Sequence, residues 1–345
     1  MAAVAWRPMR LADFDYDLPR ARIAQVPIEP RDSARLLVDQ GSSAPLHHRV
    51  SDLPLHLHDG DLLVVNDTRV IPARLRLQRA SGGAAEVLLL EPLDAQRRTW
   101  EAMVRPARKL RRGELLYTAD GTALVEIGDR TPAGDTMQIT IAAAGDPLTA
   151  VQRFGEMPLP PYIGAKLENP ERYQTVYASE PASAAAPTAG LHLTDALLQQ
   201  LAAQGVQTAR VDLVVGLDTF KPVSVDDPRD HQIHSERYQV PAETHALCRE
   251  ARRVVAVGTT SVRALESAAT FGLPEGRTRL FIHRPYDWKV VDVMMTNFHL
   301  PKTTLLLMID AFVGDRWRRL YDEALRAEYR FLSFGDAMLL DRRAG

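Results

Sequence analysis

The stretch that decides the fold of this chain is Val254-Val255-Ala256-Val257-Gly258-Thr259-Thr260-Ser261-Val262-Arg263-Ala264-Leu265-Glu266-Ser267. Its first four residues are apolar and mostly β-branched, which predicts a short strand covered on both faces. Gly258 permits a sharp exit from the strand, and Thr259, Thr260 or Ser261 can cap a following helix. The first backbone N–H groups of such a helix attract an anionic group, with Arg263 one turn in as a further donor. An ordinary strand–turn–helix connection without a ligand is the alternative for this stretch taken alone.

Length and composition narrow the class of protein. The chain has 345 residues, enough for two domains or one large one. Its 42 Lys and Arg nearly balance its 44 Asp and Glu, so any RNA site must be a local basic patch. The single cysteine, Cys248, excludes an intrachain disulfide and a cysteine zinc cluster. No apolar run reaches the roughly 18 residues that span a bilayer, and residues 1–17 lack an apolar signal core. We therefore expect a cytoplasmic protein.

The region 73–141 contains short runs of alternating apolar residues. These runs are Arg74–Gln78, Glu86–Leu90, Thr99–Val104, Leu115–Thr118, Ala123–Ile127 and Met137–Ile141. Glycine-containing turns separate them, and Asp120-Gly121 between two runs is a hairpin signal. Several short strands at this spacing, without a convincing helix, predict a small barrel or sandwich.

Helices and strands alternate on the C-terminal side of Pro187. The predicted helices are one capped by Thr194 and ended by Gly205, then Glu243–Arg252, Ser261–Ala269, Thr304–Phe312 and Arg316–Ala327. The predicted strands are Val211–Val215, Val254–Val257, Arg279–His283 and Val290–Met294, with Gly60–Asp67 as a further buried strand. This alternation predicts an α/β fold with a largely buried, mixed sheet. We therefore expect residues 1–72 and 151–345 to form one discontinuous α/β domain, with residues 73–150 as an inserted β-barrel domain.

Polar clusters follow the predicted strands. They are Asn66-Asp67-Thr68-Arg69, Gly216–Pro222, the loop with His231, His234, Ser235 and Glu236, and Thr296-Asn297-Phe298-His299. Because open α/β sheets bind ligands at the carboxyl ends of their strands, we expect several of these clusters to converge. A structural turn or a helix cap explains any one cluster equally well.

Several common functional motifs are absent. His231-x-x-His234 with Glu236, and His56-x-His58 with Asp59, contain possible metal ligands, but neither is part of a His-Glu-x-x-His helix. The phosphate signatures G-x-x-x-x-G-K-[ST] and G-x-G-x-x-G are missing, as is the G-x-S-x-G nucleophile elbow. Because neither histidine group matches a zinc-protease helix, we expect no bound metal.

A local basic cluster stands out within the β-rich region. It consists of Arg97, Arg98, Arg105, Arg108, Lys109, Arg111 and Arg112, with Trp100 among them and Glu101 as the only acid between Arg97 and Arg112. Such a cluster can bind phosphates with an affinity that falls as salt rises. A solvated loop of the β-rich domain is the alternative.

Short motifs run through nearly the whole chain. They are Asp15–Pro19, Ile23–Gln25, Glu29–Asp32, Leu62–Leu75, Pro158–Ile163, Arg172–Tyr177, Ala186–His192, Gly216–Pro222, His234–Glu236, Gly258–Ser267, Thr296–Pro301 and Tyr329–Met338. Each is weak, but so many in this order closely resemble the S-adenosylmethionine:tRNA ribosyltransferase-isomerase family of queuosine biosynthesis. His283-Arg284-Pro285-Tyr286 stands where the family usually has a Pro-Gly-Tyr turn, and Leu193 replaces a usual Phe. The first departure concerns only the shape of that loop.

The resemblance implies a fold and a reaction. Members of the family have an α/β domain interrupted by a β-barrel. They transfer and isomerise the ribosyl moiety of S-adenosylmethionine onto 7-aminomethyl-7-deazaguanine at the wobble position of tRNA. Epoxyqueuosine forms, and adenine and methionine are released. The resemblance thus implies a transferase with tRNA and S-adenosylmethionine as substrates, no further cofactor and no membrane, and we expect a monomer.

The implied chemistry suggests a role for each candidate residue. A base must remove a C5′ hydrogen acidified by the sulfonium, and the leaving adenine needs a proton on its ring. His299 and His192 are the candidates for proton transfer, because histidine titrates near neutral pH. Asp218 could accept a proton from the aminomethyl group or offset the sulfonium charge, with Glu236 as the second choice. Two further sets are binding candidates: Thr259, Thr260, Ser261 and Arg263 for the methionine carboxylate or a phosphate, and Asn297 and Asn66 for a base edge.

Two other functions compete with this interpretation. An S-adenosylmethionine-dependent RNA methyltransferase would produce S-adenosylhomocysteine instead of adenine and methionine, although the missing Gly-rich loop counts against it. A non-catalytic RNA-binding protein would need chiefly basic and aromatic surface, which the near-neutral charge disfavours.

Overall fold

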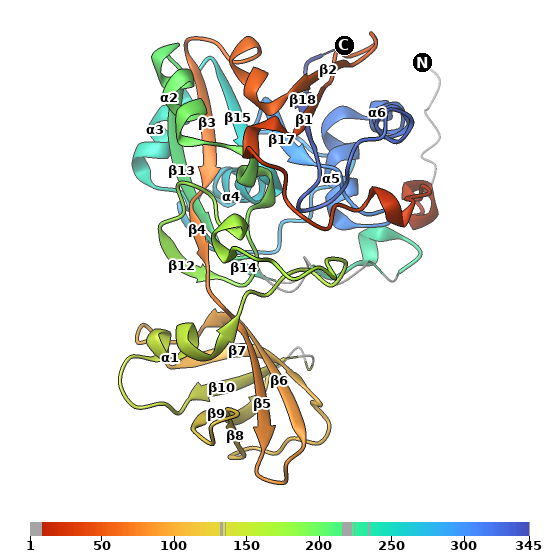
Figure 1. Ribbon diagram of the computed structural model, residues 1–345. Helices are drawn as coiled ribbons and strands as arrows, with labels where there is room; N and C mark the ends of the chain where they lie inside the picture. Colours follow the sequence, from red (N-terminus) through yellow and green to blue (C-terminus); the bar gives the residue numbers. More distant parts are fainter. Residues whose placement is uncertain are drawn as a thin grey trace.

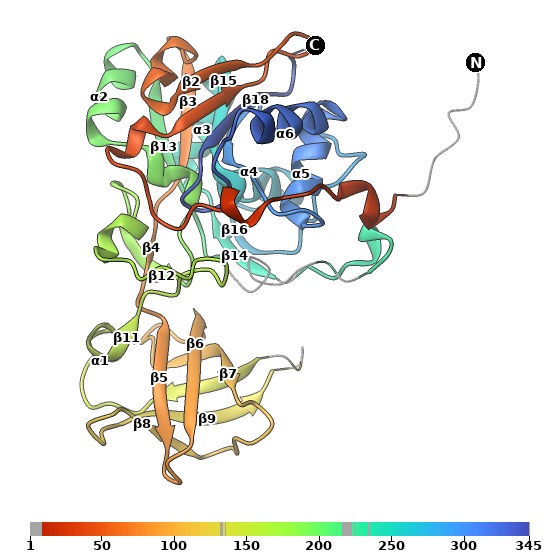
Figure 2. The ribbon, with the colours of Figure 1, turned by 45° about the vertical axis from the view of Figure 1, so that its right-hand side comes forward.

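The computed structural model describes residues 9–131, 134, 136–215, 223, 225–233 and 235–344. In these residues two large sheets form two bodies, the upper and the lower one in Figures 1 and 2. A short sheet of β4 (Thr68–Val70) and β12 (Glu180–Ser183) lies near their junction. The fold is the expected one, a mixed-sheet α/β domain interrupted by a small β-barrel.

The larger sheet has nine strands within the described residues. Their order is β16 (Glu275–Thr278), β14 (Glu236–Gln239), β13 (Gln207–Leu213), β3 (Asp61–Asn66), β15 (Arg253–Val257), β17 (Val293–Asn297), β18 (Ala337–Asp341), β1 (Arg35–Val38) and β2 (Leu46–Arg49). The four strands β13, β3, β15 and β17 are parallel to one another. The flanking pairs β14–β13, β16–β14, β17–β18 and β1–β2 are antiparallel, so the sheet is mixed.

The central strands are apolar because both faces of the sheet are covered. Leu62 and Val64 of β3 face a core shared with α4 (Gly258–Phe271), α5 (Thr304–Val313) and α6 (Arg316–Arg326). Leu63 and Val65 face a second core that includes Leu197 and Leu201 of α2 (Asp195–Ala203). Thr194 caps α2, as predicted, by accepting a hydrogen bond from the N–H of Leu197 at 3.1 Å.

The remaining helices are short. α3 (Ala242–Glu250) is tied to β13 by a hydrogen bond of 2.7 Å from Thr244 Oγ1 to the carbonyl of Arg210. The described 3₁₀ turns are η1 (Leu11–Phe14), η2 (Arg20–Arg22), η3 (Arg31–Ser33), η4 (Val50–Leu55), η5 (Pro170–Tyr173), η6 (Thr188–His192) and η8 (Pro228–Asp230).

The smaller body is a closed barrel. Its strands, in spatial order, are β5 (Arg74–Arg79), β6 (Ala84–Pro92), β7 (Thr99–Arg105), β10 (Met137–Ile141), β9 (Ala123–Arg130) and β8 (Leu115–Tyr117). Pairing of Gln78 with Tyr117 closes the ring from β5 to β8. β11 (Gly155–Glu156) then pairs with the start of β5 as the chain returns to the larger sheet. All six predicted runs are strands of this barrel, and closure decides for the barrel over the sandwich.

Helix α1 (Pro147–Phe154) follows the strand-rich region 73–141; its N-terminus is capped by Asp146, and its Val151 packs into the barrel core. Two predictions about element bounds were wrong. The predicted strand at Arg279–His283 is not one, because β16 ends at Thr278, whose partner in β14 is Glu236. Helix α4 starts at Gly258 instead of Ser261.

Candidate active site

The β15–α4 connection leaves a helix N-terminus without a side-chain cap. Gly258 has a φ of +85°, a conformation that favours glycine, and the helix begins at this residue. The prediction that Thr259, Thr260 or Ser261 caps the helix was wrong, because the N-cap residue is Val257, whose side chain makes no capping hydrogen bond. Ser261 Oγ instead donates to the carbonyl of Val257 at 2.8 Å and is fully buried. The first turn of α4 therefore remains available to an anionic ligand.

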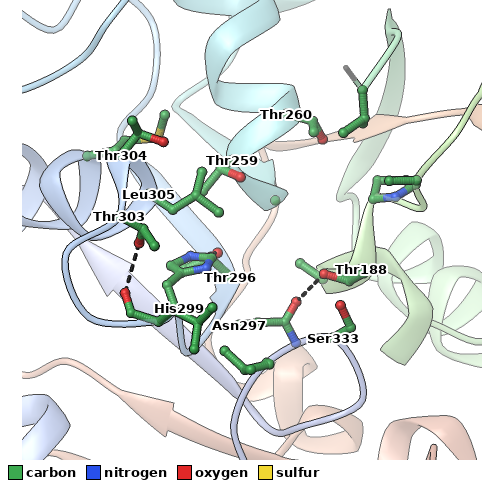
Figure 3. A pocket seen from close by; sticks show the side chains of 18 of the residues that line it. Thr188, Thr259, Thr260, Thr296, Asn297, His299, Thr303, Thr304, Leu305 and Ser333 are labelled. Atoms are coloured by element: carbon green, nitrogen blue, oxygen red, sulfur yellow. Dashed lines mark hydrogen bonds between the residues drawn. The ribbon is translucent and has the colours of Figure 1, made fainter. Parts of the chain in front are cut away.

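A cavity of about 270 Å³ lies at the carboxyl ends of β15 and β17. The predicted site residues that line it are Glu236, Thr259, Thr260, Arg263, Asn297 and His299. Other walls come from the 160–162 segment, η6, the 280–282 segment and the start of α5. Figure 3 shows Thr259 and Thr260 of α4 facing the same space as His299 and Asn297. Of the polar clusters expected to converge, the one at the end of β17 and Glu236 of the 231–236 loop meet at this cavity, together with the first turn of α4.

His299 is the histidine in the cavity wall. Its Nε2 lies 3.0 Å from Thr296 Oγ1, and its backbone N–H donates to the hydroxyl of Tyr321 at 3.0 Å. The hydroxyl of Tyr16 donates to its carbonyl. These contacts fix both the ring and the backbone. Burial lowers the pKa of His299 to about 3, so its ring is a neutral imidazole near neutral pH.

His192 is placed behind the cavity wall. Its side chain is buried, and Asn297 Nδ2 lies 3.2 Å from its Nε2. Asn297 Oδ1 in turn accepts a hydrogen bond of 2.9 Å from Thr188 Oγ1, as Figure 3 shows. Burial lowers the pKa of His192 to about 4. Among the described residues, Asn297 lines the cavity and His192 does not, so the Asn297 amide connects His192 to the cavity.

Arg263 and Glu236 form a buried ion pair beside the N-terminus of α4. Their side chains are only 8% and 3% exposed, and Arg263 Nη1 binds Glu236 Oε2. Within the described residues, Arg263 Nε and Nη2 and Thr260 Oγ1 are buried without a hydrogen-bond partner. Leaving such a group unpaired costs about 1–3 kcal/mol, so these atoms are suited to a bound acceptor.

The other candidates are not part of this wall. Asn66 is fully buried, and its amide binds backbone groups: Nδ2 donates to the carbonyl of Leu213 at 3.0 Å, and Oδ1 accepts from the N–H of Thr68 at 3.2 Å. It ties the end of β3 to the end of β13 and does not face the cavity. Asp218 and His234 lie outside the described residues.

Some cavity residues were not singled out from the sequence. Tyr162 belongs to the segment that returns from the barrel, and its hydroxyl lies 2.7 Å from Ser333 Oγ. Thr303 caps α5 by accepting from the N–H of Leu306, which brings the first turn of a second helix to the cavity. A threonine just before an apolar helical run is a capping signal and could have revealed this contribution.

Within the described residues, no group of three His, Cys, Asp or Glu side chains is arranged to hold a metal ion. In the same residues, no helix has the length and apolar character needed to cross a membrane. Burial raises the pKa of the Cys248 thiol to about 11, so it is protonated near neutral pH.

The basic cluster of the barrel divides into two parts. Trp100 is fully buried and donates to the carbonyl of Arg97 at 2.6 Å, while the guanidinium of Arg98 binds carbonyls of residues 141, 143 and 145. These residues stabilise the barrel. The exposed cations are Arg105, Arg108, Lys109, Arg111 and Arg112, the last paired with Asp129 at 3.1 Å.

The exposed cations lie at the end of the barrel far from the larger sheet. β5 enters the barrel at Arg74, where it pairs with β11, and ends at Arg79. Arg79 Nη2 donates to the carbonyl of Lys109 at 3.0 Å, which places this turn at the far end of β5. Figure 2 shows β5 running away from the larger sheet. We call Arg105, Arg108, Lys109 and Arg111 the basic turn.

The chain is similar to proteins of one family over nearly its whole length. It matches the family described as queuosine biosynthesis protein over residues 11–340. The S-adenosylmethionine:tRNA ribosyltransferase-isomerase of Symbiobacterium thermophilum is 51% identical over 343 residues, covering 96% of this chain and 100% of that protein. The protein of the same name from Moorella thermoacetica is 48% identical, with 96% and 100% covered.

A solved structure agrees with these relatives. The crystal structure of an S-adenosylmethionine tRNA ribosyltransferase from Thermotoga maritima shares 36% sequence identity and a TM-score of 0.54, covering 95% of this chain and 99% of that one. The family match, the full-length relatives and the solved structure all indicate the same family. The chain therefore belongs to the queuosine biosynthesis protein family.

Proposed function

We propose that the chain is an S-adenosylmethionine:tRNA ribosyltransferase-isomerase. It transfers and isomerises the ribosyl moiety of S-adenosylmethionine onto 7-aminomethyl-7-deazaguanine at the wobble position of tRNA. Epoxyqueuosine is formed, and adenine and methionine leave. S-adenosylmethionine is a co-substrate, and no other cofactor takes part. The observation that carries this proposal is that Arg263 and Thr260, whose buried donors have no partner among the described residues, line the same cavity as His299 and Asn297.

His299 is the proposed acceptor for the C5′ proton. The positive sulfonium makes this hydrogen acidic, so the acceptor must be unprotonated and within the cavity. His299 meets both conditions, since it lines the cavity and burial lowers its pKa to about 3. Thr296 and Tyr321 hold its ring and backbone, which keeps the acceptor atom in place without a rearrangement.

Asn297 is the proposed contact to a base edge. Its two N–H groups are directed at His192 Nε2 and at the carbonyl of Asp336, 3.2 Å and 3.4 Å away. Its Oδ1 accepts from Thr188, which leaves one lone pair for a ligand N–H. We therefore assign His192 a positioning role, in which the neutral ring orients the amide of Asn297.

The two carboxylates receive different roles. Glu236 is paired with Arg263, so we assign it the task of holding that guanidinium and not of accepting a proton from the substrate. Asp218 remains the proposed acceptor for the aminomethyl group or counter-charge for the sulfonium, by its position in the 216–222 motif that follows β13.

A product assay tests the function. The purified chain is incubated with S-adenosylmethionine and tRNA carrying 7-aminomethyl-7-deazaguanine, and the small molecules are separated by chromatography. The expected result is release of adenine and methionine in equal amounts, one of each per modified tRNA, and only when this tRNA is present. Formation of S-adenosylhomocysteine would instead identify a methyltransferase, and tRNA binding without any S-adenosylmethionine consumption would identify a non-catalytic binder.

A further inference from the structure

We propose that Arg263 and Thr260 form the seat for the α-carboxylate of S-adenosylmethionine, with Glu236 as the residue that positions Arg263. This inference rests on the proposed function, since it assumes that S-adenosylmethionine occupies the cavity. Of the two anions considered for the N-terminus of α4, a carboxylate and a phosphate, it selects the carboxylate.

The geometry of the guanidinium favours a carboxylate. Nη1 is engaged by Glu236, while Nε and Nη2 have no partner among the described residues. Nε and Nη2 form one edge of the guanidinium, and their two N–H groups are parallel. This is the fork that binds both oxygens of a carboxylate at once. Glu236 thereby determines that the Nε–Nη2 edge of Arg263, a residue that lines the cavity, is the edge left without a partner among the described residues.

The first turn of α4 adds to the attraction. Thr260 Oγ1 is buried and has no hydrogen-bond partner in the described part of the chain, and Thr259 and Thr260 both line the cavity. The partial positive charge of the α4 N-terminus lies beside them and has no side-chain cap. A carboxylate bound to Arg263 can therefore also accept from Thr260, with three protein donors on its two oxygens.

Burial argues against a tRNA phosphate at this point. Arg263 is only 7% exposed. A backbone phosphate carries a ribose on each side and could reach such a group only by burying both sugars. The carboxylate of S-adenosylmethionine stands at the end of a slender aliphatic chain, which fits a narrow approach. The apolar wall formed by Leu305, Met308 and Ile282 suits that chain.

The buried pair also explains how the seat persists without a ligand. An isolated buried guanidinium would be strongly unfavourable, but Glu236 compensates its charge. Because the pair is neutral, the bound carboxylate is attracted by the free edge and by the helix N-terminus. Glu236 acts on the ligand through Arg263, so its replacement should raise the KM for S-adenosylmethionine more than it lowers kcat.

The test compares two ligands that differ only in the carboxylate. Titration calorimetry on the full chain measures the Kd of S-adenosylmethionine and of decarboxylated S-adenosylmethionine. Unmodified tRNA is present in both titrations, so no turnover occurs. We expect the wild-type chain to prefer the carboxylated ligand about 10- to 100-fold, the range for charge-assisted hydrogen bonds. In Arg263→Gln this preference should fall to about 3-fold or less, with the affinity for the decarboxylated ligand nearly unchanged.

Two further variants guard against effects on folding. Arg263→Gln leaves the buried carboxylate of Glu236 without its cation, so the double variant Glu236→Gln/Arg263→Gln supplies a neutral hydrogen-bonded pair in its place. It should lose the preference to the same extent. Thr260→Val keeps the ion pair and should lower the preference about 3- to 10-fold by removing one donor. The matched control is Arg249→Gln on the exposed part of α3, which should retain the wild-type preference.

The outcomes separate this inference from the proposed function. If the double variant still prefers the carboxylated ligand as the wild type does, the seat is overturned. It is also overturned if Arg263→Gln weakens tRNA binding in the absence of S-adenosylmethionine and leaves the preference intact, because the anion is then a phosphate. Adenine release by the wild type is measured in parallel. Its absence would refute the proposed function, even where the ligand preference follows the seat as expected.

Discussion

Arg277, on the edge strand β16 of the larger sheet, binds Glu91 on β6 of the barrel. Arg277 Nη1 lies 2.7 Å from Oε1 and 2.8 Å from Oε2 of Glu91. The same guanidinium donates from Nε to Ser235 Oγ at 3.0 Å and from Nη2 to the carbonyl of Ser235 at 2.9 Å. Ser235 directly precedes Glu236, so one arginine connects the barrel to the wall of the candidate active site.

We predict that breaking this contact changes tRNA use more than stability. The two side chains are 49% and 14% exposed, and such an ion pair contributes about 0–1 kcal/mol to folding. Glu91→Gln should therefore leave the free energy of unfolding nearly unchanged. Because the barrel is then less firmly oriented, the KM for tRNA in the adenine-release assay should rise about 3- to 10-fold, the scale of a peripheral charge contact.

The matched control is Glu156→Gln, which also removes one negative charge and breaks the pair of Glu156 with Arg76 at 2.9 Å between β11 and β5. That pair is exposed as well, but it does not reach the larger sheet. Its loss should not alter the KM for tRNA. Equal effects of the two substitutions would show that Glu91 acts only as a surface charge.

A second prediction concerns His299. Since His299 is the proposed proton acceptor, His299→Ala should lower kcat about 100-fold or more, the usual contribution of a general base. The Kd of S-adenosylmethionine should change little, because the proposed carboxylate seat lies on α4. Thr296→Val, which removes only the hydroxyl 3.0 Å from the ring, should lower kcat less. A His299→Ala variant with wild-type turnover would eliminate the role.

The pH profile of kcat tests whether the His299 ring is neutral, as its proposed role as proton acceptor requires. Burial lowers the pKa of His299 to about 3, so the ring stays neutral as the pH falls from 8 to 5. We expect no loss of kcat with a midpoint near 6.5 that can be traced to this histidine. A protonation step near 6.5 that disappears in His299→Gln would contradict the lowered pKa.

The strands of the barrel could be predicted because their signal is local. Alternation within each run and a hairpin signal at Asp120-Gly121 depend only on neighbouring residues. Closure could not be predicted in the same way, since it depends on the pairing of Gln78 with Tyr117, far apart in the chain. The strand predicted at Arg279–His283 failed for a similar reason. Its apolar residues line the cavity, and pairing with β14 places the real strand earlier.

The candidate site was predictable where the position of a residue on the sheet decides its surroundings. Thr259, Thr260, Asn297 and His299 converge because parallel strands end at one edge. Asn66 sits at the same edge, yet its amide is occupied by backbone groups, which residue type alone does not reveal. The pairing of Arg263 with Glu236 was equally hidden, because it depends on the approach of β14 to α4.

A third prediction concerns stability at low pH. Burial lowers the pKa of His192 to about 4, against an ordinary value of 6.5 in the unfolded chain. Below pH 6.5 the unfolded chain binds a proton that the folded chain does not bind until about pH 4. The contribution of His192 to stability is thus complete above pH 6.5 and is lost as the pH falls toward 4. The slope is at most about 1.4 kcal/mol per pH unit.

Urea titrations between pH 7 and 4.5 measure this slope. Carboxylates also titrate toward the acid end, so the difference between variants is the informative quantity. His192→Gln should unfold with a shallower pH dependence than the wild type, because it removes one proton uptake by the unfolded state. His58→Gln, at an exposed position, serves as the control and should keep the wild-type slope. Parallel curves for wild type and His192→Gln would show that His192 binds protons equally in the folded and unfolded states, which contradicts the lowered pKa.

A fourth prediction concerns the basic turn. Its four exposed cations lie at the end of the barrel far from the cavity, so they are suited to phosphates that are distant from the modified base. Replacing Arg105, Arg108, Lys109 and Arg111 by Gln should weaken the binding of full-length tRNA and reduce its dependence on salt. Each phosphate that the variant no longer neutralises should make the slope of log K against log salt shallower by about 0.9. A short anticodon stem-loop lacks those distant phosphates, so it should bind the variant and the wild type equally well. Arg326→Gln, at an exposed arginine paired with Glu323 on α6, is the matched control and should leave the binding of both RNAs unchanged.

An unchanged affinity and salt slope for full-length tRNA would show that the basic turn is only a solvated loop. An equal loss of affinity for full-length tRNA and for the stem-loop would instead place the basic turn beside the anticodon.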